Sequence, residues 1–211
     1  SAGFTFSMNE NWLPPGGLCA DYFVTATMLR EPIARVLSQW DHMLDVLVTF
    51  GVAQATSTNL RTYGDLWSED ARERLRIAPA VGDNLLTRTL LGQRGFALPL
   101  GGIGEEHYVQ ARKVLLRFDV LLILEEFCPA GLQAGLRGWR QAPMKLPHAR
   151  KAQQQSSRPN RPGHDALIGL LRSLNHWDSM LYAEARTISA RDCKVWQSFL
   201  RARPGHARNY S

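Results

Sequence analysis

Arg30 and Ser38 are the first residues whose types and spacing suggest chemistry. Arg30 directly follows the uncharged run 22–29, Pro32 comes two residues later, and Ser38 lies eight residues after the arginine. Where a buried strand meets the start of a helix, backbone N–H groups and the positive end of the helix dipole favour an anion. Arg30 at such a junction can bind a phosphate through two parallel hydrogen bonds, and the Ser38 hydroxyl can donate to the same anion. The alternative is an arginine that pairs with Glu31 or a neighbouring acid, beside a solvated serine.

Two consecutive elements must position these side chains. The run 22–29 (YFVTATML) is rich in β-branched and aromatic residues and predicts a strand buried on both faces, as in a parallel sheet. From Glu31 the apolar residues recur at helical spacing, which predicts a helix that runs to about Phe50 and stops at Gly51. Pro32 suits the first turn of that helix, where its missing N–H has no consequence.

Elements further along the chain complete a predicted α/β domain. The short apolar run 119–124 (DVLLIL) predicts a second buried strand, directly after a helical pattern over 104–118. A helix that leads into a buried strand fits a βαβ-type sheet. We therefore predict a central parallel sheet with helices on both faces, in one domain over 1–200 followed by a tail over 201–211. The other predicted helices are 69–76; the segment after Asp83 or Asn84, which stops at Gly92; and 164–186.

The overall composition is that of a soluble globular protein, with 45% hydrophobic and 21% charged residues among 211. The net charge of +6 suggests anionic partners. No apolar run reaches the roughly 18–20 residues of a membrane span. The chain starts at Ser1, so we expect it to be a fragment, and the lack of a targeting signal carries no weight.

The three cysteines, Cys19, Cys128 and Cys193, are far apart and match no metal-binding spacing. We interpret them as three buried thiols, because free cysteine is often buried. One disulfide with one free thiol is the alternative.

The segment TMLREPIARVLSQW (27–40) resembles the 3′-phosphate-binding strand and helix of sulfotransferases that use 3′-phosphoadenosine 5′-phosphosulfate. The likeness is greatest to the Golgi carbohydrate branch related to heparan and dermatan/chondroitin O-sulfotransferases. Three later stretches resemble the same family in order: NLLTRTLLG (84–92), ARKVLLRFDVLLILEEF (111–127) and LNHWDSMLYAEA (174–185).

The resemblance implies a P-loop-type sulfotransferase fold and transfer of a sulfuryl group from this nucleotide to a hydroxyl of an anionic or neutral glycan. By the same resemblance, Arg30 and Ser38 hold the 3′-phosphate, no metal is needed, and the protein belongs on the lumenal side of the Golgi membrane. A membrane anchor would require upstream sequence. Arg35 also belongs to the family pattern, and we expect it to pair with Glu125 or Glu126 and fix the helix on the sheet.

The chain departs from the family in two places. The glycine-rich loop that supplies a lysine near the transferring sulfur is missing, because GGIGEE (101–106) lacks lysine and reads as a turn with a helix cap. We expect that strand and loop before Ser1. The Gly-His pair that supplies the family's base is also missing, since Phe4 follows Gly3. The histidines offer no motif for a substitute base: His42, His107, His148, His164, His176 and His206.

The segment 127–164 holds seven basic residues and no acidic ones. Removing its +7 from the net +6 leaves −1 for the rest of the chain. We predict a flexible basic loop over 137–164 that contacts an anionic sugar or closes over the nucleotide through Arg150 and Lys151; the alternative is a solvated loop. Its one tryptophan is too little aromatic content for nucleic-acid binding. A non-catalytic nucleotide- or glycan-binding domain, or a basic scaffold without a nucleotide site, remains the alternative to the enzyme.

Overall fold

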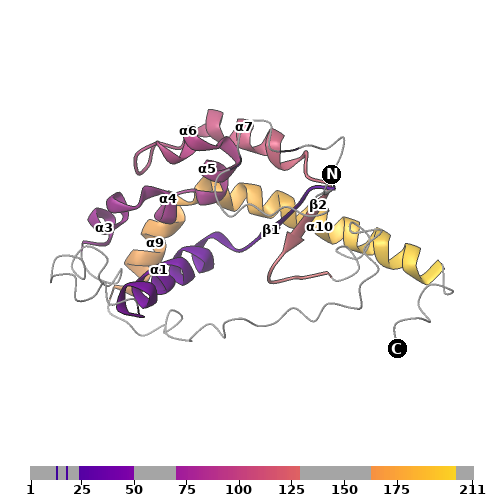
Figure 1. Cartoon of the computed structure of the whole chain (residues 1–211), viewed down its shortest axis with the longest axis horizontal. Coiled ribbons are helices and arrows are strands. Elements are labelled where there is room, and N and C mark those ends of the chain that lie inside the picture. The colour runs from indigo at the N-terminus through magenta and orange to yellow at the C-terminus, as the bar shows by residue number, and fades with distance from the viewer. Residues whose placement is uncertain (1–12, 14–17, 19–23, 50–69, 129–162, 203–211) are drawn as a thin grey trace, which may run out of the picture.

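The computed structural model describes residues 13, 18, 24–49, 70–128 and 163–202. In this part the chain is mostly helical and carries a small parallel sheet of two strands (Figure 1). The mixed α/β class predicted from the sequence is therefore confirmed. The described residues contain two strands, so the larger sheet with helices on both faces stays a prediction.

The sheet pairs β1 (Ala26–Leu29) in parallel with β2 (Val120–Ile123), and Ala26 lies opposite Val120. The predicted burial of both strands is only half right. β2 is buried at three of its four positions, whereas Met28 in β1 is 45% exposed. Alternate side chains of a strand point to opposite faces of the sheet, and Ala26 and Met28 lie on the face of β1 that is exposed.

Helix α1 (Pro32–Thr49) follows β1 directly and has Pro32 in its first turn, as predicted. The Glu31 carboxylate accepts a hydrogen bond of 2.6 Å from the backbone N–H of Ala34, so Glu31 caps the helix. The predicted stop at Gly51 lies outside the described residues.

Between α1 and β2, the described residues 70–119 form five helices. α5 begins after Asn84 and ends before Gly92, as predicted, and both flanking residues have a positive φ, 46° and 73°. The predicted cap at GGIGEE is also confirmed, because Gly104 precedes α7 and donates its N–H to His107 Nδ1 at 3.0 Å. The bounds are α3 (Ala71–Ile77), α4 (Pro79–Gly82), α5 (Leu85–Leu91), α6 (Gln93–Phe96) and α7 (Glu105–Leu115).

The C-terminal helical pattern forms two helices where we predicted one, α9 (His164–Leu174) and α10 (His176–Ala202). Asn175 separates them. Its buried side-chain amide donates to the carbonyls of Gly82 and Leu171, and its side-chain oxygen accepts from the N–H of Asn84. The bonds to Gly82 and Asn84 are tertiary contacts with the α4–α5 turn. The spacing of apolar residues along 164–186 does not predict them.

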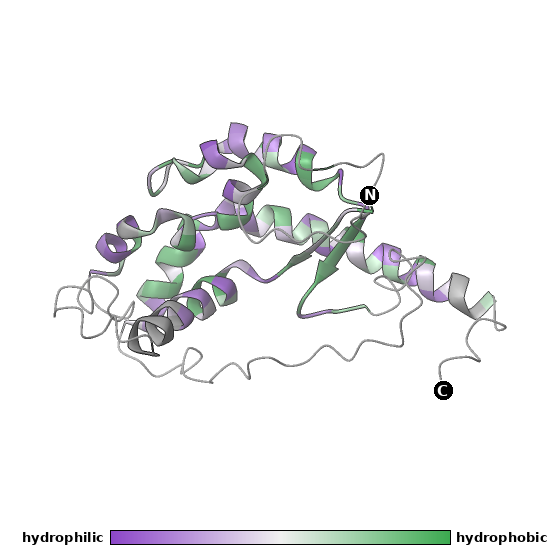
Figure 2. Cartoon of the chain, viewed as in Figure 1, coloured by the Kyte–Doolittle hydropathy of each residue, from purple (hydrophilic) through white to green (hydrophobic). Residues whose placement is uncertain are grey.

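Two hydrophobic clusters hold the elements together. The first joins the sheet to α5, α7 and α10 and includes Leu29, Leu115, Ile123, Leu181 and Ala185. The second joins α1, α3 and α9. Figure 2 shows the strands and α9 mainly in the hydrophobic colour, while hydrophilic segments recur along α7 and α10. Four leucines of the two C-terminal helices are buried: Leu167, Leu171, Leu174 and Leu181. The apolar face of this helical pattern is therefore part of the core.

Two acids that flank β2 hold both ends of β1. The Asp119 carboxylate accepts hydrogen bonds of 2.8 Å from the backbone N–H and the hydroxyl of Thr25. Glu125 accepts one of 3.1 Å from the N–H of Glu31. Both acids lie 94 residues after their partners, the same offset that separates the paired strand residues Ala26 and Val120. The two clamps are thus in register with the strands.

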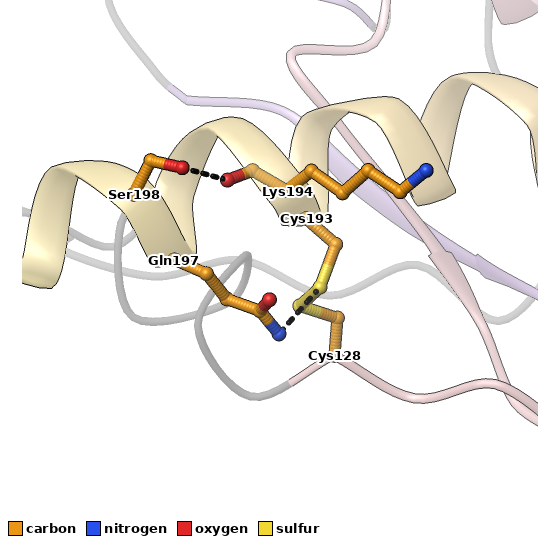
Figure 3. Close-up of a disulfide and its surroundings, with 5 residues drawn as sticks. All are labelled: Cys128, Cys193, Lys194, Gln197 and Ser198. Atoms are coloured by element: carbon orange, nitrogen blue, oxygen red, sulfur yellow. Dashed lines mark hydrogen bonds between the residues drawn. A yellow bond between two sulfur atoms is a disulfide. The ribbon is translucent and has the colours of Figure 1, made fainter.

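A disulfide joins Cys128, just after β2, to Cys193 in α10 (Figure 3). The interpretation of three buried thiols is therefore wrong, and the alternative with one bridge holds. The two cysteines lie 65 residues apart in sequence, and only packing of α10 against β2 brings them together.

Candidate anion-binding site

Arg30 lies where the sequence predicted it, between the end of β1 and the start of α1. Its Nε is 3.9 Å from Glu125 Oε1, and the two side chains are 32% and 38% exposed. A long ion pair between exposed groups contributes little to stability. Arg30 therefore does have an acidic neighbour, as the alternative interpretation expected, but the ion pair is weak. Its guanidinium stays accessible from solvent.

Glu125 ties three elements together at this junction. Oε1 accepts from the Glu31 N–H, and Oε2 accepts from the Tyr182 hydroxyl of α10, both at 3.1 Å. Burial of the phenol, together with its bond to the negative Glu125, raises the pKa of Tyr182 to about 12. Tyr182 therefore stays protonated and donates to Glu125 throughout the neutral range.

Ser38 lies in α1, two turns beyond the helix cap Glu31, and is half-buried. Residues seven apart share one face of a helix, so Ser38 lies on the face of Glu31, about 10 Å further along the axis. Within the described chain, its hydroxyl has no hydrogen bond that would compete with a ligand. Within the described residues, Arg30 and Ser38 do not contact each other. An anion bound by both side chains stays a prediction.

Arg35 does not take the partner that we expected. It donates from Nη2 to the carbonyl of Val81 at 2.9 Å, whereas Glu125 contacts Tyr182 and Glu126 contacts Arg186. Its pKa is lowered by burial and by the nearby Arg30 charge, against the opposing charge of Asp178. Its Nε and Nη1 are buried without a hydrogen-bond partner. Arg35 thus ties α1 to α4, a supporting role as predicted but on another element.

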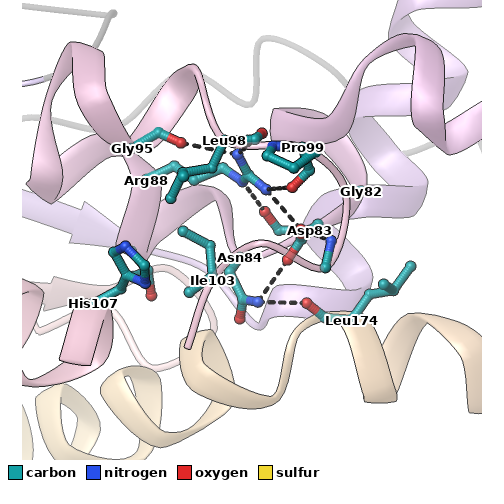
Figure 4. A network of polar contacts seen from close by, with 12 residues as sticks. Gly82, Asp83, Asn84, Arg88, Gly95, Leu98, Pro99, Ile103, His107 and Leu174 are labelled. Carbon is teal, nitrogen blue, oxygen red and sulfur yellow. Dashed lines mark hydrogen bonds and ion pairs between the residues drawn. The ribbon is translucent and has the colours of Figure 1, made fainter. Parts of the chain in front are cut away.

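A buried polar network around Asp83, Asn84 and Arg88 joins the start of α5 to the segment 95–99 and to Leu174 at the end of α9 (Figure 4). Arg88 is fully buried and uses all of its donor nitrogens within the protein. Because none of these nitrogens is left over, Arg88 is a structural residue. Its partners are the Asp83 carboxylate at 2.6 Å and the backbone carbonyls of Asp83, Gly95, Leu98 and Pro99.

Within the described part of the chain, no histidine contacts Arg30 or Glu125. The contacts at this junction join Glu125 to Arg30, Glu31 and Tyr182. His107 caps α7, and His176 packs edge-on against Trp177 with ring centroids 4.8 Å apart. His148 and His206 lie outside the described residues, as do Arg150 and Lys151 of the predicted basic loop.

The described residues hold no cluster of three or more His, Cys, Asp or Glu side chains arranged to bind a metal ion. None of their helices combines the length and the apolar character that a membrane crossing requires.

No family model, curated protein or solved structure matches this chain.

Reasoning from the sequence did not single out Tyr182, and it named Glu125 only as a partner for Arg35. Each was part of a stretch that resembles the sulfotransferase family, Glu125 in 111–127 and Tyr182 in 174–185. The sequence does not tell that the end of β2 and the second turn of α10 come together beside Arg30. Chemically, the arrangement offers one accessible guanidinium, one hydroxyl along α1 and a carboxylate held by a phenol.

Proposed function

We propose that this chain is part of a carbohydrate sulfotransferase that uses 3′-phosphoadenosine 5′-phosphosulfate, and that Arg30 and Ser38 bind the nucleotide's 3′-phosphate. The reaction moves a sulfuryl group from the nucleotide to a hydroxyl of an anionic or neutral glycan. Positive groups stabilise the charge that develops on the leaving phosphate. Arg150 and Lys151 would add basic contacts from the loop over 137–164.

The observation that carries this proposal is the meeting of the four stretches that resemble the family. The stretch with Arg30 contacts the stretch with Glu125, which contacts Tyr182 in the last stretch. Asn84 and Thr87 of the remaining stretch bond with Asp178, which lies about one turn before the same tyrosine in α10. Residues chosen for their resemblance alone thus contact one another, as residues of one functional unit would.

The position of Arg30 in the sheet also supports the proposal. Arg30 and Glu125 follow the carboxyl ends of two parallel strands. In open α/β sheets, ligands bind in the crevice at this edge. The start of α1 lies there as well, although the Glu31 carboxylate already caps its N3 position.

The disulfide is consistent with the proposed lumenal location. Disulfides persist in oxidising compartments such as the secretory pathway and are rare in the cytosol. The Cys128–Cys193 bridge therefore favours a protein that folds inside that pathway.

Binding of adenosine 3′,5′-bisphosphate, measured by calorimetry, tests the site. Loss of one charge-assisted phosphate contact costs about 1.5–3 kcal/mol, so Arg30→Ala should weaken binding about 10- to 150-fold. Ser38→Ala removes one neutral donor and should weaken it about two- to tenfold. Arg186→Ala is the matched control, because it removes an equal charge from an arginine that pairs with Glu126. An affinity that Arg30→Ala leaves unchanged would remove Arg30 from the site.

A binding domain without transferase activity is the second candidate. It is favoured by the lack of a histidine among the residues that contact Arg30 and Glu125 in the described part of the chain. Incubation with the sulfur-labelled nucleotide and a panel of desulfated glycans separates the two. Label on a glycan supports the enzyme, whereas nucleotide binding without transfer supports the binding domain.

A further inference from the structure

Glu125 supplies a negative charge at the place where the proposed function puts a phosphate. Its Oε1 is 3.9 Å from Arg30 Nε and 3.1 Å from the backbone nitrogen of Glu31, the N–H just ahead of α1. Its Oε2 is held from the other side by Tyr182. A carboxylate therefore already accepts a donor that an anion at this junction would use.

A phosphate on Arg30 would come close to this carboxylate. The two anions would compete for one guanidinium, and like charges about 4 Å apart repel strongly enough at a protein surface to change an affinity several-fold. Glu125 can yield Arg30 without losing its place, because the bonds from the Glu31 N–H and the Tyr182 hydroxyl do not involve the guanidinium.

We propose that Glu125 is the internal counter-anion of this site, which neutralises Arg30 in the free protein and which a phosphate monoester must displace from Arg30 in order to bind. The inference rests on the proposed function, since it takes a phosphate monoester as the ligand. Glu125 then lowers the affinity of the site for anions, because a ligand must compete with it for Arg30.

The test is the affinity of adenosine 3′,5′-bisphosphate for the wild type and for Glu125→Gln. Glutamine keeps the shape and one accepting oxygen but removes the charge, so binding should become about three- to tenfold tighter. Glu126→Gln is the matched control. It removes the same charge one residue away, where Glu126 pairs with Arg186, and should change the affinity less than twofold.

Tyr182→Phe separates the charge of Glu125 from its placement. It removes the bond to Oε2 and leaves the carboxylate charged, so it should give no tightening. Equal tightening in Tyr182→Phe and Glu125→Gln would overturn the inference, as would a Glu125→Gln affinity equal to or weaker than that of the wild type.

The outcomes also distinguish this inference from the proposed function. Wild-type binding that Arg30→Ala abolishes, without tightening in Glu125→Gln, supports the function and rejects the inference. Binding that appears only in Glu125→Gln supports the inference. If neither the wild type nor Glu125→Gln binds the nucleotide, the proposed function and the inference are both rejected, because no phosphate site then exists at Arg30.

Discussion

Asn84 and Asp178 cap each other's helices although they lie 94 residues apart in the chain. The Asp178 carboxylate of α10 accepts from the N–H groups of Leu86 and Thr87, which are free donors in the first turn of α5. In return, the side-chain oxygen of Asn84 accepts from the N–H of Asp178 at 3.0 Å. This exchange fixes the N-terminal end of α10. Tyr182, which donates to Glu125, follows in the same helix.

Replacing Asn84 should strongly destabilise the fold. Asn84 is buried at φ 46° and bonds through its side chain to Asp83, Leu174 and Asp178. Asn84→Ala leaves buried groups without partners and puts at a left-handed position a residue that tolerates it less well than asparagine, so the free energy of unfolding should fall by about 3–5 kcal/mol. Glycine adopts a positive φ readily. The free energy of unfolding should therefore fall by about 1 kcal/mol less in Asn84→Gly than in Asn84→Ala. Urea unfolding measures both.

The exposed Gln110 of α7 provides the control for Asn84. Gln110→Ala also removes an amide side chain, and it should change stability by less than about 0.5 kcal/mol. Equal losses in Asn84→Ala and Gln110→Ala would contradict the reciprocal capping.

Asp178 should make stability depend on pH. Burial raises the pKa of its carboxyl above the ordinary 3.8, although hydrogen bonds from Thr87 and the Arg35 charge oppose the rise. Below the unfolded-state pKa both states are protonated, and the stabilising contribution is complete. As the pH rises through the raised folded-state pKa, that contribution is lost. Unfolding free energies measured from pH 4 to 8 should therefore fall, and this fall should be smaller in Asp178→Asn.

Glu126 acts in the opposite direction and must be separated from Asp178. Its hydrogen bond from Arg186 lowers the pKa of its carboxyl, so its contribution is present above the unfolded-state pKa and is lost as the pH falls. The Glu126→Gln background removes this effect. A pH profile that Asp178→Asn leaves unaltered in that background would show that Asp178 titrates alike in both states.

Removing the disulfide should lower stability substantially. A bridge between residues 65 apart restricts the unfolded chain, and loop-closure entropy predicts a loss on the order of 4 kcal/mol for the Cys128→Ser/Cys193→Ser variant. Cys19→Ser is the control and should not reproduce this loss. Thiol titration of the unreduced, denatured protein should find one thiol per chain. Three thiols would mean that the bridge does not form.

Local patterns in the sequence predicted the elements of the site better than their partners. The position of α1, its first-turn proline, β2 and both ends of α5 followed from apolar spacing and from cap residues, which act over a few positions. Arg30 was placed correctly for the same reason. The exposure of Met28, by contrast, depends on which elements cover that face of the sheet, and no local pattern records that.

The errors have a common cause in contacts between distant segments. Asn175 ends α9 because its amide bonds to the α4–α5 turn, more than 90 residues earlier. Arg35 meets Val81 where we expected Glu125 or Glu126, and Cys128 meets Cys193 because α10 crosses β2. Glu125 and Tyr182 lie in two of the stretches that resemble the family, but the resemblance does not tell that they bond to each other.

The Cys128–Cys193 bond closes a covalent ring that contains the whole basic stretch 137–161 together with α9. A protease that cuts inside this ring opens the chain without separating its pieces. The nicked protein should run as one species on a gel until reductant is added, and α10 should stay attached to the sheet. Cleavage there alters the covalent topology of the molecule but not its composition.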